Sequence, residues 1–153
     1  FFFLILMFIG GCAGSTTCGI KIFRVQILYQ FFSNQIKKII YPHGVFNMKY
    51  EEQNIDEKFM SSVISFIYLF FIIFFIVTSL LTINGLDLVS ALSAAATAIS
   101  NVGPGLGDTI GPNGNFAEIS NNSKWILSFA MILGRLELFA ILVLFIPSFW
   151  RKF

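Results

Sequence analysis

One long stretch of the chain, residues 59–83, carries no charged side chain and is mostly apolar. Its 25 residues would form about 37 Å of helix, enough to cross a bilayer core of about 30 Å with some tilt. A second apolar stretch covers residues 125–150, with Arg135 and Glu137 as its only charges and a tryptophan, which suits the membrane interface, at each end. We expect both stretches to be transmembrane helices.

A third apolar stretch, Leu88 to Ile99, is too short to cross the membrane. It is rich in alanine and serine, and as a helix it would extend only about 18 Å. The residues after it, Asn101 to Gly107, include three glycines and a proline, which rule out a continuing helix. We expect a short helix that enters the membrane and an irregular chain that returns to the same side, followed by the polar residues 108–124. Such backbone is tolerated at that depth only where protein or water satisfies its polar groups.

The beginning of the chain predicts a helix that is broken inside the membrane. Residues 1–9 and 20–32 are helix-like, but residues 10–19 contain four glycines and three hydroxyl residues, which lower helix propensity at several successive positions. Residue 1 is Phe and no signal-peptide pattern is present, so we expect this to be the C-terminal part of a longer protein. Further on, the turn signal of residues 41–44 and the weak alternation of residues 45–50 predict a small strand or hairpin.

Charge placement predicts the orientation in the membrane. Residues 84–124, between the two long spans, contain Lys124 as their one basic residue, whereas basic residues gather before the first span and after the second. These are Lys21, Arg24, Lys37, Lys38, Lys49, Lys58, Arg151 and Lys152. By the positive-inside rule residues 21–58 and the C-terminal end are cytoplasmic, and residues 84–124 enter from outside.

The composition agrees with a membrane protein and argues against other classes. Apolar residues make up 56% and charged residues 12% of the 153 residues, and the mean hydropathy is +0.81, whereas a soluble domain carries about 25% charged residues. A net charge of only +2 argues against nucleic-acid binding. No nucleophile–base pair or carboxylate pair indicates an enzyme, and we expect no cofactor. Cys12 and Cys18 have no histidine or carboxylate nearby, so we expect inert buried thiols rather than a metal site.

The glycine-rich stretch near the start has two interpretations. Residues 14–19 have the G-x-x-x-x-G spacing of a phosphate-binding loop, but Ile20 precedes Lys21 and no serine or threonine follows, so nucleotide binding is rejected. Gly10 and Gly14 form a G-x-x-x-G pair that would serve close helix packing. Alternatively, the stretch is a polar loop across a water-filled path, where its hydroxyls and carbonyls meet a permeating ion.

Arg135 is a charge near the middle of a predicted span, which marks a site that faces a partner or water. Glu137 lies about 200° away around the helix and should not pair with it. Arg135 must therefore find oxygen atoms on another element, and the broken helix at residues 10–19 is the obvious supply. The alternative is that Arg135 is a structural staple between helices with no gating role.

The short helix and the residues after it resemble part of an ion pore. A helix over residues 87–100 that enters from outside would point its C-terminal end, with about half a negative charge, into the membrane, which favours a cation. Asn101-Val102-Gly103-Pro104 would return as extended chain with carbonyls lining a path, and its order of residue types parallels the T-V-G-Y of potassium filters. One spanning helix, pore helix, filter loop and spanning helix make one quarter of a ring. The alternative is an extracellular turn that caps an interfacial helix.

Three motifs stand in order along the chain. They are Gly10-Gly11-Cys12-Ala13-Gly14-Ser15-Thr16 with Gly19-Ile20-Lys21, then Asn101-Val102-Gly103-Pro104-Gly105-Leu106-Gly107, then Leu133-Gly134-Arg135-Leu136-Glu137-Leu138-Phe139 with Pro147-Ser148-Phe149-Trp150-Arg151. Together they resemble the C-terminal third of the Trk/Ktr/HKT superfamily of potassium transporters, and its TrkH-type pore subunits most of all. The family commonly has more glycine where this chain has Thr17 and Cys18, which predicts a stiffer loop or altered gating.

The resemblance implies an all-α membrane protein built of helix–pore-loop–helix repeats like those of potassium channels, with a broken helix of the preceding repeat first. Its divisions would be the broken second helix of repeat three (1–32), a cytoplasmic connection (33–58), the first helix of repeat four (59–83), pore helix and filter (84–107), an extracellular segment (108–124), the second helix of repeat four (125–150) and a cytoplasmic end (151–153).

The resemblance also implies roles for particular residues. The fourth filter strand would be Ser100, Asn101, Val102, Gly103 and Pro104, with K⁺ at Asn101, Val102 and Gly103. Gly103 would be the glycine associated with preference for potassium over sodium. The gate loop below the filter would be Gly10, Gly11, Cys12, Ala13, Gly14, Ser15, Thr16, Thr17, Cys18 and Gly19, and Arg135 would hold it.

The function that the resemblance implies is potassium uptake through a gated pore in a bacterial plasma (inner) membrane. The implied partners are the remaining repeats of the same pore subunit, a second copy in a homodimer, a cytoplasmic nucleotide-binding regulatory subunit and membrane lipid, but no nucleic acid. The alternative function is a non-conducting membrane protein whose broken and re-entrant helices hold it together or bind a partner.

Overall fold

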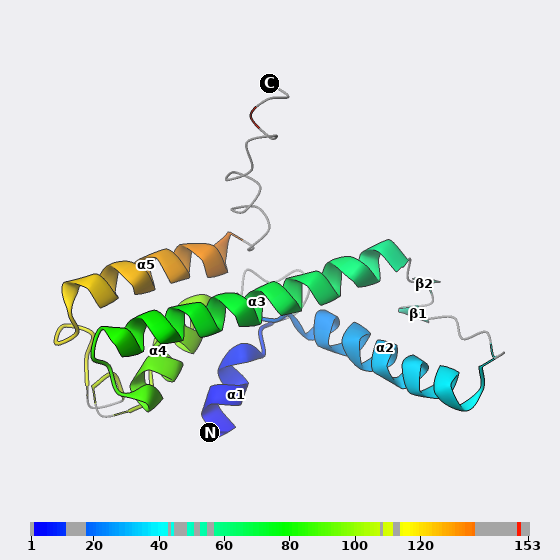
Figure 1. Ribbon diagram of the computed structural model, residues 1–153, viewed down its shortest axis with the longest axis horizontal. Coiled ribbons are helices and arrows are strands. Elements are labelled where there is room, and N and C mark those ends of the chain that lie inside the picture. The colour runs from blue at the N-terminus through cyan, green and yellow to red at the C-terminus, as the bar shows by residue number, and fades with distance from the viewer. Residues whose placement is uncertain are drawn as a thin grey trace.

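The computed structural model describes residues 2–11, 18–42, 44, 49–50, 53–54, 57–107, 109–111, 114–136 and 150. These form the helices α1 (Phe2–Phe8), α2 (Ile22–Ile40), α3 (Glu57–Ile83), α4 (Leu88–Ser100) and α5 (Asn121–Arg135), and the strands β1 (Lys49–Tyr50) and β2 (Gln53–Asn54) (Figure 1). The described part of the chain is thus helical apart from one short antiparallel pair, in which Lys49 lies opposite Asn54. The predicted helical class is confirmed.

Helix α3 matches the first predicted span, and it is the one helix among the described residues that is long and apolar enough to cross a membrane. Its buried residues recur every three or four positions and so share one face; they are Met60, Val63, Phe66, Phe70, Phe74, Val77, Thr78 and Leu81. Large apolar side chains such as Phe75 and Ile76 are exposed on the remaining surface. A helix that is apolar on all sides but packs against protein on only one is typical of a membrane span whose other sides face lipid.

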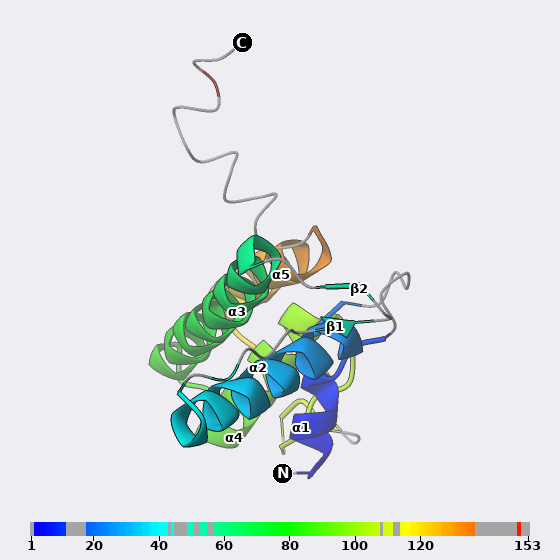
Figure 2. The ribbon, with the colours of Figure 1, turned by 90° about the vertical axis from the view of Figure 1, so that its right-hand side faces the viewer.

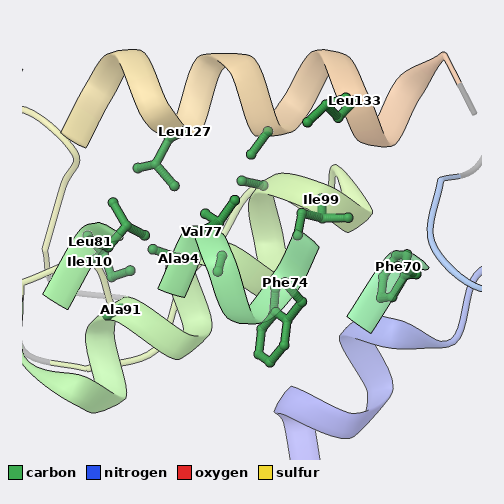
Figure 3. Close-up of a cluster of buried hydrophobic side chains, with 14 of the residues drawn as sticks. Phe70, Phe74, Val77, Leu81, Ala91, Ala94, Ile99, Ile110, Leu127 and Leu133 are labelled. Carbon is green, nitrogen blue, oxygen red and sulfur yellow. The ribbon is translucent and has the colours of Figure 1, made fainter. Parts of the chain in front are cut away.

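Helix α4 is the short apolar helix predicted before the glycine-rich stretch, and it lies at the centre of the core. All residues from Ser93 to Ser100 are buried, and α4 packs against α3, α5 and α1. Figure 3 shows Leu127 and Leu133 of α5 pointing toward side chains of α3 and α4, among them Val77 and Ile99. Alanine dominates α4, which lets the neighbouring backbones approach closely.

Helix α5 differs from the predicted second span at its start. It begins at Asn121, before the apolar stretch, because the side chain of Ser120 accepts a hydrogen bond from the amide of Ser123 (3.3 Å) and caps the helix. It ends at Arg135, with Leu136 as its C-cap. Residues 137–149 of the predicted span lie outside the described residues, so the single helix predicted over residues 125–150 stays a prediction beyond Leu136.

The broken helix at the start is present as α1 and α2, which diverge from a common point beneath α3 (Figure 1). Viewed end-on, α3 and α5 lie above α1 and α2 (Figure 2). Helix α2 continues through Ile40 rather than ending near Phe32, because no glycine or proline interrupts it until Pro42, and the residue before a proline disfavours helix. It packs on α3 through Ile27 against Met60 and Val63.

The small hairpin predicted around residues 45–50 is present as β1 and β2. Strand β1 forms the end of the predicted stretch, and residues 45–48 lie outside the described residues.

Candidate functional site

The return limb (residues 101–107) leaves the buried C-terminal end of α4 and runs back along it. Asn101 caps the helix in the left-handed conformation (φ 51°, ψ 42°), with its amide bonded to Ala98 O, and asparagine is one of the few residues that enter this region readily. The amide of Val102 then donates to Thr97 O (3.1 Å). Gly103 has a φ of 106°, a conformation that side-chain-bearing residues rarely adopt. These turns reverse the chain within four residues.

The carbonyl oxygens at the start of the return limb have no partner within the described residues. The amides of Val102 and Gly103 are both hydrogen-bonded to Thr97, but no described donor reaches the carbonyls of Asn101, Val102 and Gly103. Residues 101–104 are exposed. Main-chain oxygens without a protein donor are ligands of the kind that binds a dehydrated monovalent cation.

Helix α5 fixes the base of the return limb. The side-chain amide of Asn101 donates to Met131 O of α5 at 3.1 Å. At Gly134, a Cβ atom would collide with the carbonyl of Ile99, near the end of α4. Only glycine therefore lets α5 approach α4 so closely at this level, which places Arg135, the next residue, beside the buried end of α4.

The two ends of the broken-helix loop (residues 10–19) are joined by backbone hydrogen bonds. Ile9 and Ile20 form a parallel bridge, in which the amide of Gly10 donates to Ile20 O and the amide of Ile20 donates to Phe8 O, both at 2.9 Å. A Cβ atom on Gly10 would lie 2.6 Å from Cys18 O. Gly10 thus serves close packing of the loop's own two ends, and Gly14, the other member of the G-x-x-x-G pair, lies outside the described residues with the rest of 12–17.

The loop meets the buried end of α4. A Cβ atom on Gly19 would lie 3.5 Å from Ser100 Oγ, so the loop and the last residue of the predicted pore helix are in contact. Ser100 is 3% exposed, and its hydroxyl has no hydrogen-bond partner among the described residues. The structure therefore brings Gly19, at the described end of the predicted gate loop, against Ser100, the first residue predicted to belong to the filter.

Arg135 reaches this loop. Its Nη1 lies 3.8 Å from the sulfur of Cys18, and a thiol sulfur is a weak acceptor. Cys18 is buried and reduced. Arg135 thus meets residues 10–19 as predicted through the Cys18 sulfur, and the prediction that oxygen atoms of this loop bind it stays a prediction, because residues 12–17 lie outside the described residues. Glu137 lies outside the described residues.

Two hydroxyl residues that hold the return limb, Ser93 and Thr97, were not among the predicted site residues. The signal that could have found them is their spacing of four positions in a helix otherwise rich in alanine, because buried hydroxyls need hydrogen-bond partners. The sequence marks Gly134 only as part of a motif, because its close approach to Ile99 joins segments that are far apart in the chain.

The chain matches the profile of the TrkH family, described as a cation transport protein, over residues 1–152. It is 45% identical over 150 residues to the Trk system potassium uptake protein TrkI of Halomonas elongata, covering 98% of this chain and 30% of the relative. It is 36% identical over 145 residues to the Trk system potassium uptake protein TrkH of Salmonella typhimurium, covering 95% of this chain and 29% of the relative.

Among solved structures, the crystal structure of the potassium transporter TrkH from Vibrio parahaemolyticus superposes with a TM-score of 0.87 at 33% sequence identity, covering 97% of this chain and 31% of that chain. The chain thus spans about 30% of the length of the curated relatives that it matches.

Proposed function

The chain belongs to the TrkH family of cation transport proteins, and on that premise we propose that it forms part of a gated potassium-uptake pore in a bacterial plasma membrane. Members of this family are membrane transporters and not enzymes. In the proposal this segment supplies one filter strand, the start of the return limb, and the gate below it, the broken-helix loop.

The observation that carries the proposal is the row of unpaired carbonyls of Asn101, Val102 and Gly103. Replacing the hydration shell of K⁺ requires several oxygen atoms that no protein donor occupies. The return limb meets this condition because its amides are turned to α4. The C-terminal end of α4 lies beside these carbonyls and adds about half a negative charge, which favours a cation and disfavours an anion.

The proposed gate is the broken-helix loop. It lies against Ser100 at the foot of the filter, its base is closed by the Ile9–Ile20 bridge, and Arg135 contacts it from α5. A polar loop in this place would block an ion that leaves the filter until the loop moves. Arg135 would favour the closed position by holding Cys18.

The proposed partners follow from the share of the pore that this segment provides. In the proposal this segment supplies one of four filter strands. Because the chain spans about 30% of the length of its relatives, the other three strands would belong to the remaining repeats of the same subunit. We include in the proposal a homodimer and a cytoplasmic nucleotide-binding regulatory subunit. The exposed Lys37 and Lys38 at the end of α2 support a cytoplasmic location for this end, because basic residues favour the cytoplasmic side.

The test is Gly103→Ser in the full-length protein, expressed in a strain that lacks potassium uptake. A Cβ atom at this position meets nothing within 4 Å, so serine acts through the backbone, which must leave its φ of 106° and move the carbonyls. We expect weaker discrimination between potassium and sodium in uptake measurements.

The matched control is Gly85→Ser in the turn between α3 and α4. Gly85 has a φ of 91° and equally open surroundings, so the substitution imposes similar backbone strain away from the proposed filter. We expect unchanged selectivity in this control. If the Gly103 variant keeps the uptake and the potassium-over-sodium selectivity of the Gly85 control, the result would contradict the pore assignment and favour a non-conducting role.

A further inference from the structure

Four buried hydroxyl residues lie along one face of α4. Ser90, Ser93, Thr97 and Ser100 are spaced by three, four and three positions, the spacing of a single helix face, and each is at most 3% exposed. Buried hydroxyls in an alanine-rich helix are unfavourable unless they form hydrogen bonds. Their partners therefore show what this face of α4 does.

Two of the four hydroxyls bind the main chain of the return limb. Thr97 Oγ1 accepts the amide of Gly103 at 2.8 Å. Ser93 Oγ accepts the amide of Leu106 at 2.9 Å and donates to Leu106 O at 2.6 Å. An extended segment normally receives such bonds from a neighbouring strand; here the side chains of α4 supply them.

The hydrogen bond from Gly103 to Thr97 lies where few side chains pack against the limb. A hollow of about 180 Å³ borders Thr97 and Gly103 on the side of α5, where Leu127 and Met131 also line it. No atom lies within 4 Å of the position that a Cβ on Gly103 would occupy. Because packing does not clamp the peptide of Gly103, its orientation depends on the hydrogen bond to Thr97.

We propose that Thr97 is a positioning residue that determines cation selectivity: its hydroxyl orients the Val102–Gly103 peptide and so sets where the carbonyl of Val102 faces the ion. This inference rests on the proposed function of the return limb as a filter strand. Ser93 anchors the far end of the same limb, away from the carbonyls of residues 101–103, and so contributes to stability more than to selectivity.

The test compares Thr97→Val, which keeps the shape and loses the acceptor, with Thr97→Ser, which keeps the hydroxyl. The readout is the ratio of potassium to sodium uptake by the full-length protein, normalised to the amount in the membrane. We expect the ratio to fall about two- to tenfold in the valine variant, the range given by the loss of one hydrogen bond, and to stay near the wild-type value in the serine variant.

A matched control is Thr78→Val in α3. Thr78 is also buried, but its hydroxyl donates to Phe74 O in its own helix at 2.9 Å, so the same chemical change should leave the uptake ratio unaltered. If the valine variant at Thr97 fails to accumulate, Thr97→Cys replaces it, because a thiol is nearly the shape of serine but a weaker acceptor. Its uptake ratio should then lie below that of the serine variant.

Three outcomes would overturn the inference: an unchanged ratio in Thr97→Val, an equal loss in Thr97→Ser, which would show that keeping the hydroxyl does not preserve the ratio, or an equal loss in Thr78→Val. The variant Gly103→Ser separates this failure from failure of the filter itself. If Gly103→Ser lowers the ratio and Thr97→Val does not, the limb is a filter strand that Thr97 does not position. If neither changes the ratio, the proposed function fails as well.

Discussion

The return limb and the broken-helix loop both place irregular backbone at the buried end of α4, but they are held in different ways. The limb is bonded to side chains of the helix that it follows, six and thirteen positions back in sequence. The described ends of the loop are bonded to each other through main-chain groups of Phe8, Gly10 and Ile20, and the side chain of Arg135, 117 positions from Cys18, contacts the loop from α5.

This difference matches what a filter and a gate each require. A filter strand has to keep its carbonyls in one arrangement, and several local hydrogen bonds to a buried helix provide that rigidity. A gate needs two positions that differ by little free energy, and in the proposed function the contact of Arg135 with Cys18 would favour one of them. Helix α5 touches both regions, through Gly134 and Arg135, so substitutions there distinguish the two.

The largest effect is expected from Gly134→Ala, which should disturb the limb. The added methyl group collides with the backbone carbonyl of Ile99, and backbone cannot yield as a flexible side chain does, so α5 must move away from α4. Such overpacking destabilises by about 1–3 kcal/mol. Thermal unfolding of the purified full-length protein measures it, with Ser128→Ala on the exposed side of α5 as the control. Equal stability of the two variants would show that α5 does not brace the limb.

Arg135→Ala should act on the loop and leave the limb intact. Loss of about 1 kcal/mol of closed-state stabilisation would raise potassium flux about fivefold, without a change in the ratio of potassium to sodium uptake. Flux measurements in vesicles that contain the full-length protein test this expectation. No change in flux or regulation would leave Arg135 as a structural staple between helices.

A smaller effect of the same sign is expected from Cys18→Ala, because it removes the sulfur that Arg135 contacts at 3.8 Å and leaves the arginine charge in place. The double variant should show little more flux than Arg135→Ala alone, since the two residues share one contact. Fully additive effects would mean that Arg135 holds the loop through other groups.

The sequence predicted the elements whose signals are local. The uncharged run of residues 59–83 predicted α3, and the glycines and proline after Ile99 predicted that α4 stops short. The apolar pattern of residues 125–150 predicted α5 but not its start at Asn121, which depends on the cap at Ser120. The sequence placed residues 33–58 in a connection because their start is mostly polar, whereas α2 continues to Ile40.

The sequence proposes positions for the candidate site, but it does not predict the contacts that hold them. Asn101 to Pro104 and Arg135 stand out as a motif and as a charge in an apolar stretch, which are features of single segments. The bonds from Thr97 to Gly103 and from Asn101 to Met131 depend on how the limb folds back and how α5 packs. Hydrophobic periodicity does not encode such contacts, and hydroxyls in a buried helix only hint at them.

The most direct test of the central claim is anomalous diffraction from crystals of the full-length protein grown with Rb⁺, which replaces K⁺ as a heavier ion. The account predicts an anomalous peak in contact with the carbonyl oxygens of Asn101, Val102 and Gly103. A well-ordered return limb with no ion at these oxygens, or a limb that lies flat on the protein surface, would contradict it.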